Sequence, residues 1–214
     1  MQPAVTDAPR VFGRAGGSLV GATWAVNDAV ARVGRQAELR TARVLDGLAS
    51  RPDGPTVLHD LAIPIPNISA NIDHVVVSGR RVLIIDSKGW RPARYWSLGR
   101  MAFRGWRRFG HANGSTPRIA VDGLNRYFKG RGVRALLVTP VVVVWPSSDR
   151  GRLSVALLGM DGCRVIRGPQ LARAVRRSVG LRPANPDIVE ALRRLLNAPS
   201  GRSPRRVPAA QRHR

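Results

Sequence analysis

The sequence predicts one mixed α/β domain, in which strands and helices share a core. Apolar residues recur at three- and four-residue steps over 25–49, the spacing of a helix with one buried face. Apolar, β-branched runs at 71–78, 81–87 and 134–146 have the composition of strands. The chain has 214 residues, 43% of them hydrophobic, which is enough for one domain with a substantial core.

The two ends of the chain lack this periodicity. Residues 1–17 hold Pro, Gly and Arg in no regular order, and we expect a flexible N-terminal segment there. Residues 199–214 carry five arginines and no acid, as in a disordered basic tail. Such a tail would either aid solubility or contact phosphates without reading sequence. The folded domain is therefore expected over 18–198.

The first half of the domain reads as a helix followed by strands. The helix over 25–49 presents an apolar stripe and ends at the sequence RPDGP, residues 51–55. A short strand over 57–61 and a loop follow it. Two longer strands are expected over 71–78 and 81–87, and a hairpin turn is expected at Leu98–Arg100. The apolar stripe of the helix consists of Val30, Val33, Ala37, Thr41, Val44 and Leu48.

The second half alternates strands and helices. Thr116 is expected to cap a helix that has Pro117 at its first position and runs to about Lys129. The continuous apolar run over 134–146 is typical of a central strand that is covered on both faces. A hairpin is expected over 153–166, with Asp161-Gly162 as its turn. Helices are expected over 169–179 and 186–197, and the second has Asn185 as its cap and Pro186 as its first residue.

The charge favours a polyanionic partner. The net charge is +23 and the pI is about 12, so DNA is the first candidate, RNA is possible, and an anionic membrane surface is weaker. Part of the excess could instead reflect G- and C-rich coding DNA. The single cysteine, Cys163, excludes an internal disulfide and a cysteine-based metal site, and fits a cytoplasmic location. Neither a signal peptide nor an 18-residue apolar stretch is found, so no transmembrane helix is expected, and a membrane is not expected to be the main partner.

The hairpin over 71–90 contains two aspartates and a lysine where core residues would be expected. If Gly79-Arg80 form the turn, each pair of opposite residues sums to 159, which places Asp73 directly opposite Asp86. Their Cβ atoms would then lie about 4.5–5.5 Å apart. Lys88 lies two residues beyond Asp86 and so shares its face.

Two carboxylates held opposite each other are unfavourable unless a cation neutralises them. Hard oxygen ligands favour Mg²⁺ or Mn²⁺, and such an ion beside an ammonium group suits phosphodiester hydrolysis. Only two of the 36 basic residues are lysines, which suggests that position 88 needs a compact ammonium group. The alternative is an acid pair in which Lys88 only forms a salt bridge, and a one-residue slip in register would separate the three side chains.

A second cluster combines arginines with aromatic residues. Residues 90–134 contain ten arginines and one acid, Asp122, and FRGWRRFGH over 103–111 interleaves the two kinds. This mixture is typical of phosphate contact with base stacking, and the candidates are Arg104, Trp106, Arg107 and Arg108. Alternatively, the tryptophans pack beneath a loop and the arginines are only solvated.

The two histidines near these strands have a structural interpretation. His74 points away from the acids and is expected to be buried and hydrogen-bonded. His59 is expected at a loop or strand end. Cys163 is expected to be structural.

Four stretches together resemble the nuclease-related domain (NERD) members of the PD-(D/E)xK nuclease superfamily. They are GRQAE at 34–38, VLHDLAIP at 57–64, NIDHVVV at 71–77 and VLIIDSKGW at 82–90. The resemblance is clear over about residues 30–100 and vague beyond, and the domain's core would span about 30–150. It implies a restriction-endonuclease-like α/β fold with a central mixed sheet flanked by helices.

The resemblance also implies roles for individual residues. Asp73 and Asp86 resemble the metal-binding acids, with the Ser87 carbonyl as a further ligand, and Lys88 resembles the lysine that positions water. Glu38 resembles the acid of the first helix that assists the metal. A further helix motif has no clear match, and Asn125 and Tyr127 are its candidates.

The sequence therefore predicts a metal-dependent nuclease-like protein acting on DNA. Two other classes remain open: a DNA-binding module of nuclease fold without catalysis, and a basic adaptor for RNA or membranes. The completeness of the acid–acid–lysine set favours the enzyme.

Overall fold

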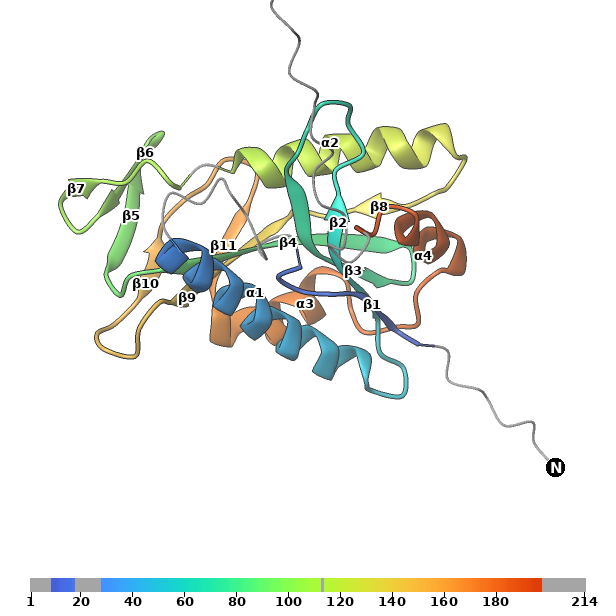
Figure 1. The fold of residues 1–214 in the computed structure, drawn as a ribbon, viewed down its shortest axis with the longest axis horizontal. Helices are drawn as coiled ribbons and strands as arrows, with labels where there is room; N and C mark the ends of the chain where they lie inside the picture. Colours follow the sequence, from blue (N-terminus) through green and yellow to red (C-terminus); the bar gives the residue numbers. More distant parts are fainter. Residues whose placement is uncertain (1–8, 18–27, 113, 198–214) are drawn as a thin grey trace, which may run out of the picture.

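The computed structural model describes residues 9–17, 28–112 and 114–197, and its core is a mixed sheet between two layers of helices (Figure 1). The seven strands of this main sheet run in the order β1-β2-β3-β4-β9-β11, with β8 beside β4. They are β1 (Val11–Gly13), β2 (Thr56–Ala62), β3 (Asn71–Ser78), β4 (Arg81–Trp90), β8 (Leu136–Leu137), β9 (Val141–Pro146) and β11 (Arg164–Arg167).

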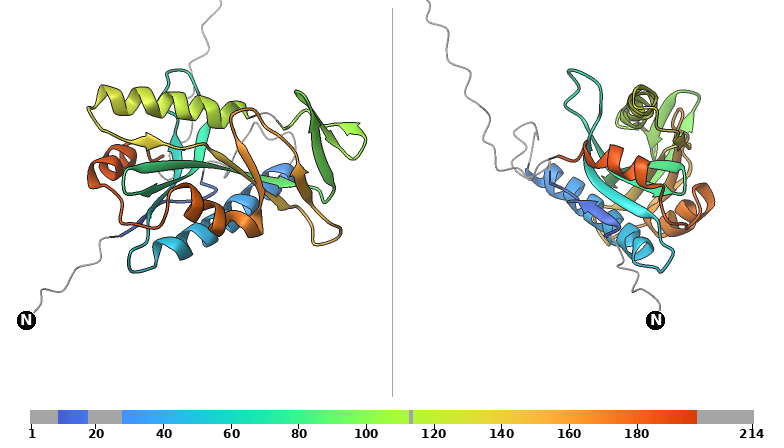
Figure 2. Two further views of the ribbon diagram at one scale, coloured as in Figure 1. Left: turned by 180° about the vertical axis from the view of Figure 1, so that it is seen from behind. Right: turned by 90° about the vertical axis from the view of Figure 1, so that its right-hand side faces the viewer.

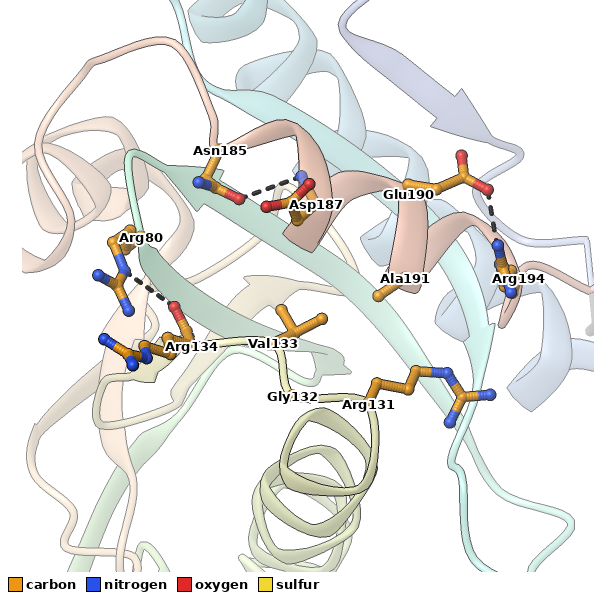
Figure 3. Close-up of a pocket in the computed structure, with 10 residues that line it drawn as sticks. All are labelled: Arg80, Arg131, Gly132, Val133, Arg134, Asn185, Asp187, Glu190, Ala191 and Arg194. Carbon is orange, nitrogen blue, oxygen red and sulfur yellow. Dashed lines mark hydrogen bonds and ion pairs between the residues drawn. The ribbon is translucent and has the colours of Figure 1, made fainter.

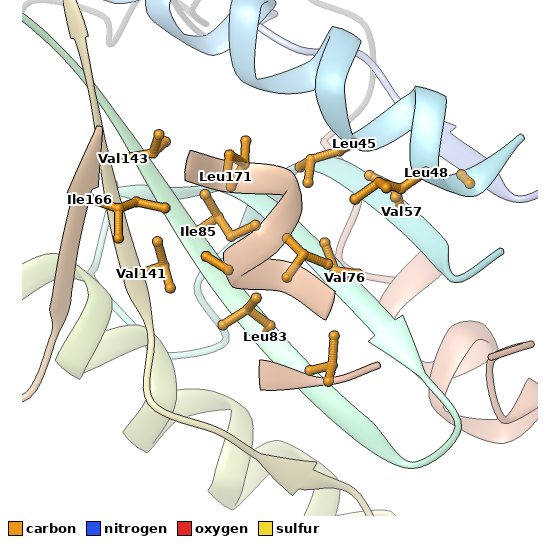
Figure 4. Packing of buried hydrophobic residues seen from close by; sticks show 14 residues of the cluster. Leu45, Leu48, Val57, Val76, Leu83, Ile85, Val141, Val143, Ile166 and Leu171 are labelled. Atoms are coloured by element: carbon orange, nitrogen blue, oxygen red, sulfur yellow. The ribbon is translucent and has the colours of Figure 1, made fainter. Parts of the chain in front are cut away.

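Helices cover both faces of the main sheet, as the second views show (Figure 2). On one face, α1 (Asp28–Ala49) and α3 (Leu171–Ser178), which follows a short 3₁₀ turn at Gly168–Gln170, pack on a cluster that includes Leu45, Ile85 and Val143 (Figure 4). On the other face, α2 (Ser115–Gly130) and α4 (Pro186–Arg193) pack on a second cluster. The central strands are therefore buried on both sides, which explains their continuous apolar sequence.

The β3–β4 hairpin has the register that the sequence predicts. Ser78 pairs with Arg81 and His74 pairs with Ile85, so each pair sums to 159. Gly79, the first turn residue, has a φ of +55°, which a residue with a side chain adopts only under strain. The glycine thus fixes the register on which the positions of the two aspartates depend.

A smaller sheet of four strands lies at one end of the molecule (Figures 1 and 2). Its order is β10-β5-β6-β7, formed by β10 (Ser154–Leu157), β5 (Arg94–Leu98), β6 (Met101–Arg104) and β7 (Arg107–Arg108). The expected turn at Leu98–Arg100 is confirmed, because β5 and β6 pair antiparallel across it. One face of this sheet packs on a third cluster, which contains Trp90, Tyr95 and Val144.

Several expectations about the elements were wrong. No hairpin forms over 153–166: β10 pairs parallel with β5, β11 pairs parallel with β9, and only one bridge, Met160–Cys163, spans the expected turn. The apolar run over 134–146 is interrupted and forms the two strands β8 and β9. The N-terminal segment contributes β1, which pairs with β2.

The helix boundaries differ less. The cap of α2 is Gly114, not Thr116, whereas Asn185 caps α4 as expected, accepting hydrogen bonds from the amides of Asp187 and Ile188. Val30 of the expected apolar stripe is exposed, and the basic tail over 199–214 lies outside the described residues. Among the described residues, no helix combines the length and hydropathy needed to cross a bilayer.

Candidate functional site

Asp73 and Asp86 occupy adjacent strands at one end of the main sheet. The β3–β4 register carries them opposite each other, one step beyond the pair His74–Ile85. The carboxylate of Asp73 also crosses to β4, where its Oδ2 accepts a hydrogen bond of 2.7 Å from the backbone N–H of Ser87. The two acids are therefore held near each other by strand pairing and by the bond between Asp73 and the amide of Ser87, the residue after Asp86.

Lys88 joins the two aspartates from the same face of β4. Its Nζ lies 3.0 Å from Oδ1 and 2.9 Å from Oδ2 of Asp86. Only the contact with Oδ1 has the geometry of a hydrogen bond, so the buried Oδ2 takes part in an ion pair but accepts no hydrogen bond. The Lys88 side chain is 36% exposed and that of Asp86 is 9% exposed, so the site opens to solvent on the lysine side.

Glu38 reaches this group of charges from α1. Its side chain is buried, and its Oε2 accepts a hydrogen bond of 2.9 Å from the backbone N–H of Gly16. Burial raises the pKa of Glu38 to about 7, and the charges of Asp60 and Asp86 add to the rise, while the Gly16 amide and Lys88 oppose it. This carboxyl group therefore changes charge near neutral pH.

The other charged groups influence each other strongly. Burial raises the pKa of Asp73 well above its usual range, and repulsion by Asp86 and Glu38 adds to this. Burial alone would lower the pKa of Lys88, but attraction by Asp86, Asp73 and Glu38 outweighs it, so its pKa is raised. Lys88 is therefore an ammonium group at neutral pH.

Asp60 is an acid near the site that the sequence analysis did not single out. It lies on β2 between His59 and Leu61, which pair with His74 and Ile72, but its φ of +57° interrupts the strand pairing at this residue, and its charge acts on Glu38. Its Oδ1 accepts hydrogen bonds of 3.0 Å from Asn71 and from Asn197. The sequence signal that could have found Asp60 is its position next to His59, since Asp73 likewise lies next to His74.

A divalent cation fits the chemistry of Asp73 and Asp86. The buried oxygen of Asp86 accepts no hydrogen bond, and the two neighbouring acids repel each other. Among the described residues, no three His, Cys, Asp or Glu side chains are close enough together to hold a metal ion. Such an ion would therefore take two carboxylates at most from this set, and other oxygens, such as the Ser87 carbonyl, water or phosphate, would complete its shell.

A chain of buried hydrogen bonds lies behind the two acids, beneath α1. His59 Nδ1 lies 2.7 Å from His74 Nδ1, and His74 Nε2 lies 3.1 Å from Ser87 Oγ. Ser87 Oγ donates to Thr41 Oγ1 at 2.8 Å, and Trp145 Nε1 donates to the same oxygen at 2.9 Å. Because the Ser87 hydroxyl donates its hydrogen to Thr41, His74 Nε2 must donate to Ser87. These hydrogen bonds hold Ser87 in place between Asp86 and Lys88.

The two histidines confirm one expectation and correct another. His74 is fully buried and hydrogen-bonded, as the sequence predicts. His59 is not at a strand end: it is buried inside β2, pairs with His74, and also lies 3.0 Å from Asp46. Burial lowers the pKa of both histidines, that of His74 well below its usual value.

The buried His74 predicts a loss of stability in acid. Its folded-state pKa is lowered, so its stabilising contribution is complete above the unfolded pKa of about 6.5 and is lost as the pH falls below that value. We expect this contribution to decrease by about 1.4 kcal/mol for each pH unit below 6.5. The measurement is the difference in free energy of unfolding between wild type and His74→Gln, in urea, from pH 8 to 5.5. A difference that does not vary with pH would contradict the prediction.

The remaining candidates lie away from the acids. Arg104, Trp106, Arg107 and Arg108 are in the small sheet, on β6, β7 and the turn between them. Asn125 of α2 is exposed, and Tyr127 donates a hydrogen bond of 2.8 Å to the carbonyl of Ala191, so neither extends the site.

A cavity of about 620 Å³ lies elsewhere, between the β3–β4 turn, the end of α2 and α4 (Figure 3). Arginines and acids line it, among them Arg80, Arg134 and Glu190, and none of the residues Asp73, Asp86 and Lys88 does. The charged residues that line it are all exposed, so the largely buried cluster at the β3–β4 hairpin is the better candidate for chemistry.

Comparison with known proteins gives one family. A family model of the nuclease-related domain, NERD, matches residues 33–144, just over half of the chain. This range includes α1 and the whole β3–β4 hairpin, and thus Glu38, Asp73, Asp86 and Lys88. No curated protein and no solved structure matches the chain.

Proposed function

Since the chain belongs to the nuclease-related domain family, whose fold is restriction-endonuclease-like, we propose that it hydrolyses phosphodiester bonds of DNA with a divalent metal ion. The convergence of Asp73, Asp86 and Lys88 on one face of the β3–β4 hairpin is the observation that supports this proposal. The net charge of +23 supports a nucleic acid as the substrate.

Each residue has a distinct role in the proposed reaction. Asp73 and Asp86 would hold Mg²⁺ or Mn²⁺, with the Ser87 carbonyl as a third ligand. The chemistry that such an ion supplies is the stabilisation of charge on phosphate oxygens and the acidification of water. Lys88, held against Asp86 and open to solvent, would orient the attacking water and donate to a phosphate oxygen. Glu38 would accept a proton near neutral pH.

Nicking of supercoiled plasmid tests this function. We expect the wild type to nick plasmid in Mg²⁺ and not in EDTA, and Asp86→Asn to lose nicking. Asp149→Asn is the matched control, because Asp149 is an exposed acid outside the site, and it should nick normally. Equal nicking by wild type and Asp86→Asn would contradict the proposal. DNA binding by wild type with no nicking in any metal would favour the non-catalytic module.

Thermal unfolding tests metal binding without relying on activity. Because an ion would relieve the repulsion between Asp73 and Asp86, Mg²⁺ should stabilise the fold, by about 2.7 kcal/mol at 100 times its dissociation constant. Asp73→Asn and Asp86→Asn should abolish this stabilisation, whereas Asp149→Asn should keep it. The measurement is the melting temperature across a Mg²⁺ titration, and an equal metal effect in all four proteins would place the ion elsewhere.

A further inference from the structure

The small sheet has a solvent-facing side on which aromatic and apolar side chains gather. Of the eight exposed large hydrophobic side chains among the described residues, four belong to this sheet or its turns: Leu98, Met101, Trp106 and Leu157. Trp106 is 92% exposed. Exposed apolar patches of this kind indicate an interaction surface.

Strand pairing shows that these side chains share one face. Trp96 lies opposite Phe103, Leu98 lies opposite Met101, and Leu157 lies beside Trp96. The alternate residue Tyr95 faces the other way and is buried in the third core cluster. One side of the sheet is therefore attached to the domain, and the side that carries the aromatic residues is turned to solvent.

The aromatic rings are held in a fixed arrangement. Trp96 and Phe103 stack, with centroids 4.5 Å apart and planes inclined by 16°. Trp96 Nε1 donates a hydrogen bond of 2.7 Å to the carbonyl of Gly105, which keeps the indole in place. Trp106 stands edge-on to Trp96, at 6.2 Å. Gly105, with a φ of +59°, makes the tight turn that presents Trp106 at the tip.

The strands that form this surface carry arginines and no acid. None of the residues from 90 to 121 is an acid, and neither is any residue of β10. Arg94 lies on the same face as Trp96, and Arg108 pairs with Phe103 on that face. Arg104 and Arg107 pair with each other on the opposite side, so of the four residues that the sequence analysis nominated, only Trp106 and Arg108 belong to this surface.

The small sheet is connected to the candidate site through its buried side. Lys88 pairs with Val144 of β9, and Val144 lies in the cluster beneath the small sheet. Trp90, two residues after Lys88, packs on Tyr95 at 4.8 Å and on Phe109 at 4.9 Å. Trp96 follows Lys88 by eight residues, a stretch of chain that spans no more than about 28 Å, so one oligonucleotide could contact both.

We propose that the solvent-facing side of the small sheet, formed by Trp96, Phe103, Trp106, Leu98, Met101 and Leu157 with Arg94 and Arg108, binds single-stranded nucleic acid by stacking its unpaired bases. Aromatic rings on an exposed sheet face, flanked by arginines, are the features with which single-strand-binding folds hold bases and phosphates. Paired bases present no free face to such rings, so duplex should bind by charge alone. The inference rests on the proposed function in one respect: the single strand that binds here would also be the substrate of the proposed nuclease.

The test measures binding in EDTA, where cleavage cannot interfere. The probes are fluorescein-labelled single-stranded DNA of about 12 nucleotides, the same length of RNA, and the DNA duplex, with full-length protein; this length is within the site size of about 4–16 nucleotides typical of such folds. We expect single strands to bind more tightly than duplex. Trp106→Ala should weaken single-strand binding about 5- to 150-fold, the effect of losing one stacked base, and should change duplex binding less than about 2-fold.

Three further variants control this measurement. Trp106→Phe keeps a ring and should retain single-strand binding, whereas Leu136→Ala, which removes an exposed apolar side chain from the main sheet, should have no effect. Arg108→Gln should lower the salt dependence of single-strand binding by about 0.7 in slope, the loss of one phosphate contact. Unchanged melting temperatures would show that the variants fold, which the exposure of Trp106 leads us to expect.

Three results would overturn the inference. One is a Trp106→Ala variant that binds single strands like wild type, and another is an equal loss for single strand and duplex. The third is self-association of the wild type that Trp106→Ala abolishes, because a second copy of the chain would then cover the surface. If the wild type fails to nick but Trp106→Ala selectively weakens single-strand binding, only the enzyme is refuted. If the wild type nicks but Trp106→Ala has no selective effect on binding, only the stacking surface is refuted. Tighter binding of the RNA probe than of the DNA probe would identify RNA as the single-stranded ligand of this surface.

Discussion

Replacing Lys88 by alanine is expected to lower plasmid nicking about 10²- to 10³-fold, the usual effect of removing one donor that stabilises a transition state. The reason is geometric and electrostatic. The ammonium lies within 3.0 Å of Asp86 Oδ1, is partly open to solvent, and stays protonated because three neighbouring acids raise its pKa above the ordinary value, despite burial. It is the one positive charge in direct contact with the acids of the site among the described residues.

The chain provides a matched control for Lys88. Lys129, the other lysine, is exposed at the end of α2, and Lys129→Ala should nick like wild type. Lys88→Arg keeps the charge but replaces a compact ammonium by a larger planar group, so we expect only partial activity from it. The measurement is the initial nicking rate with Mg²⁺ in excess. Equal rates for Lys88→Ala and Lys129→Ala would show that the ion pair with Asp86 has only a structural role.

Replacing Glu38 by glutamine should stabilise the metal-free protein at pH 8 by about 3 kcal/mol. The pKa of Glu38 rises from 4.5 to about 7 on folding, mainly through burial, and each unit is equivalent to about 1.4 kcal/mol. A raised carboxyl pKa gives a contribution that is complete below pH 4.5 and is lost as the pH rises through 7. Glutamine avoids this loss, because it stays neutral and its oxygen can still accept the Gly16 hydrogen bond.

Urea unfolding of wild type and Glu38→Gln at pH 4.5, 6 and 8 would measure this effect. We expect the two proteins to be equally stable at pH 4.5 and to diverge as the pH rises. Glu190→Gln is the control, because Glu190 is exposed on α4, where it pairs with Arg193 and Arg194, and its removal should give no such divergence. A wild type that is more stable than Glu38→Gln at pH 8 would contradict the prediction and would mean that the charge of Glu38 is compensated.

The sequence was sufficient for the part of the fold that depends on local signals. A Gly-Arg turn between two apolar runs fixes the β3–β4 register, and with it the positions of Asp73 and Asp86, one step beyond the last pair, His74–Ile85. The same local logic failed over 153–166, because Asp161-Gly162 makes only a one-bridge turn, and β10 and β11 pair with strands that lie far away in the chain. Parallel partners of this kind leave no signal in the residues between them.

The site could be predicted only in part for the same reason. The spacing of Asp73, Asp86 and Lys88 follows from one hairpin, whereas the His59–His74 contact depends on the β2–β3 register across a loop of irregular sequence. Asp60, whose charge acts on Glu38, has a left-handed backbone that interrupts this register, and no local pattern predicts that. The amide of Gly16, which binds Glu38, comes from a segment without periodicity, so no pattern in the sequence could place it there.

This contact of Gly16 has a practical consequence for anyone who shortens the protein. Trimming the first 17 residues to help crystallisation would remove both β1 and the hydrogen bond that lowers the pKa of Glu38. The shortened protein would keep every acid of the site, and yet the pKa of Glu38 would differ. Titration profiles obtained with truncated material should therefore not be assigned to the full-length chain.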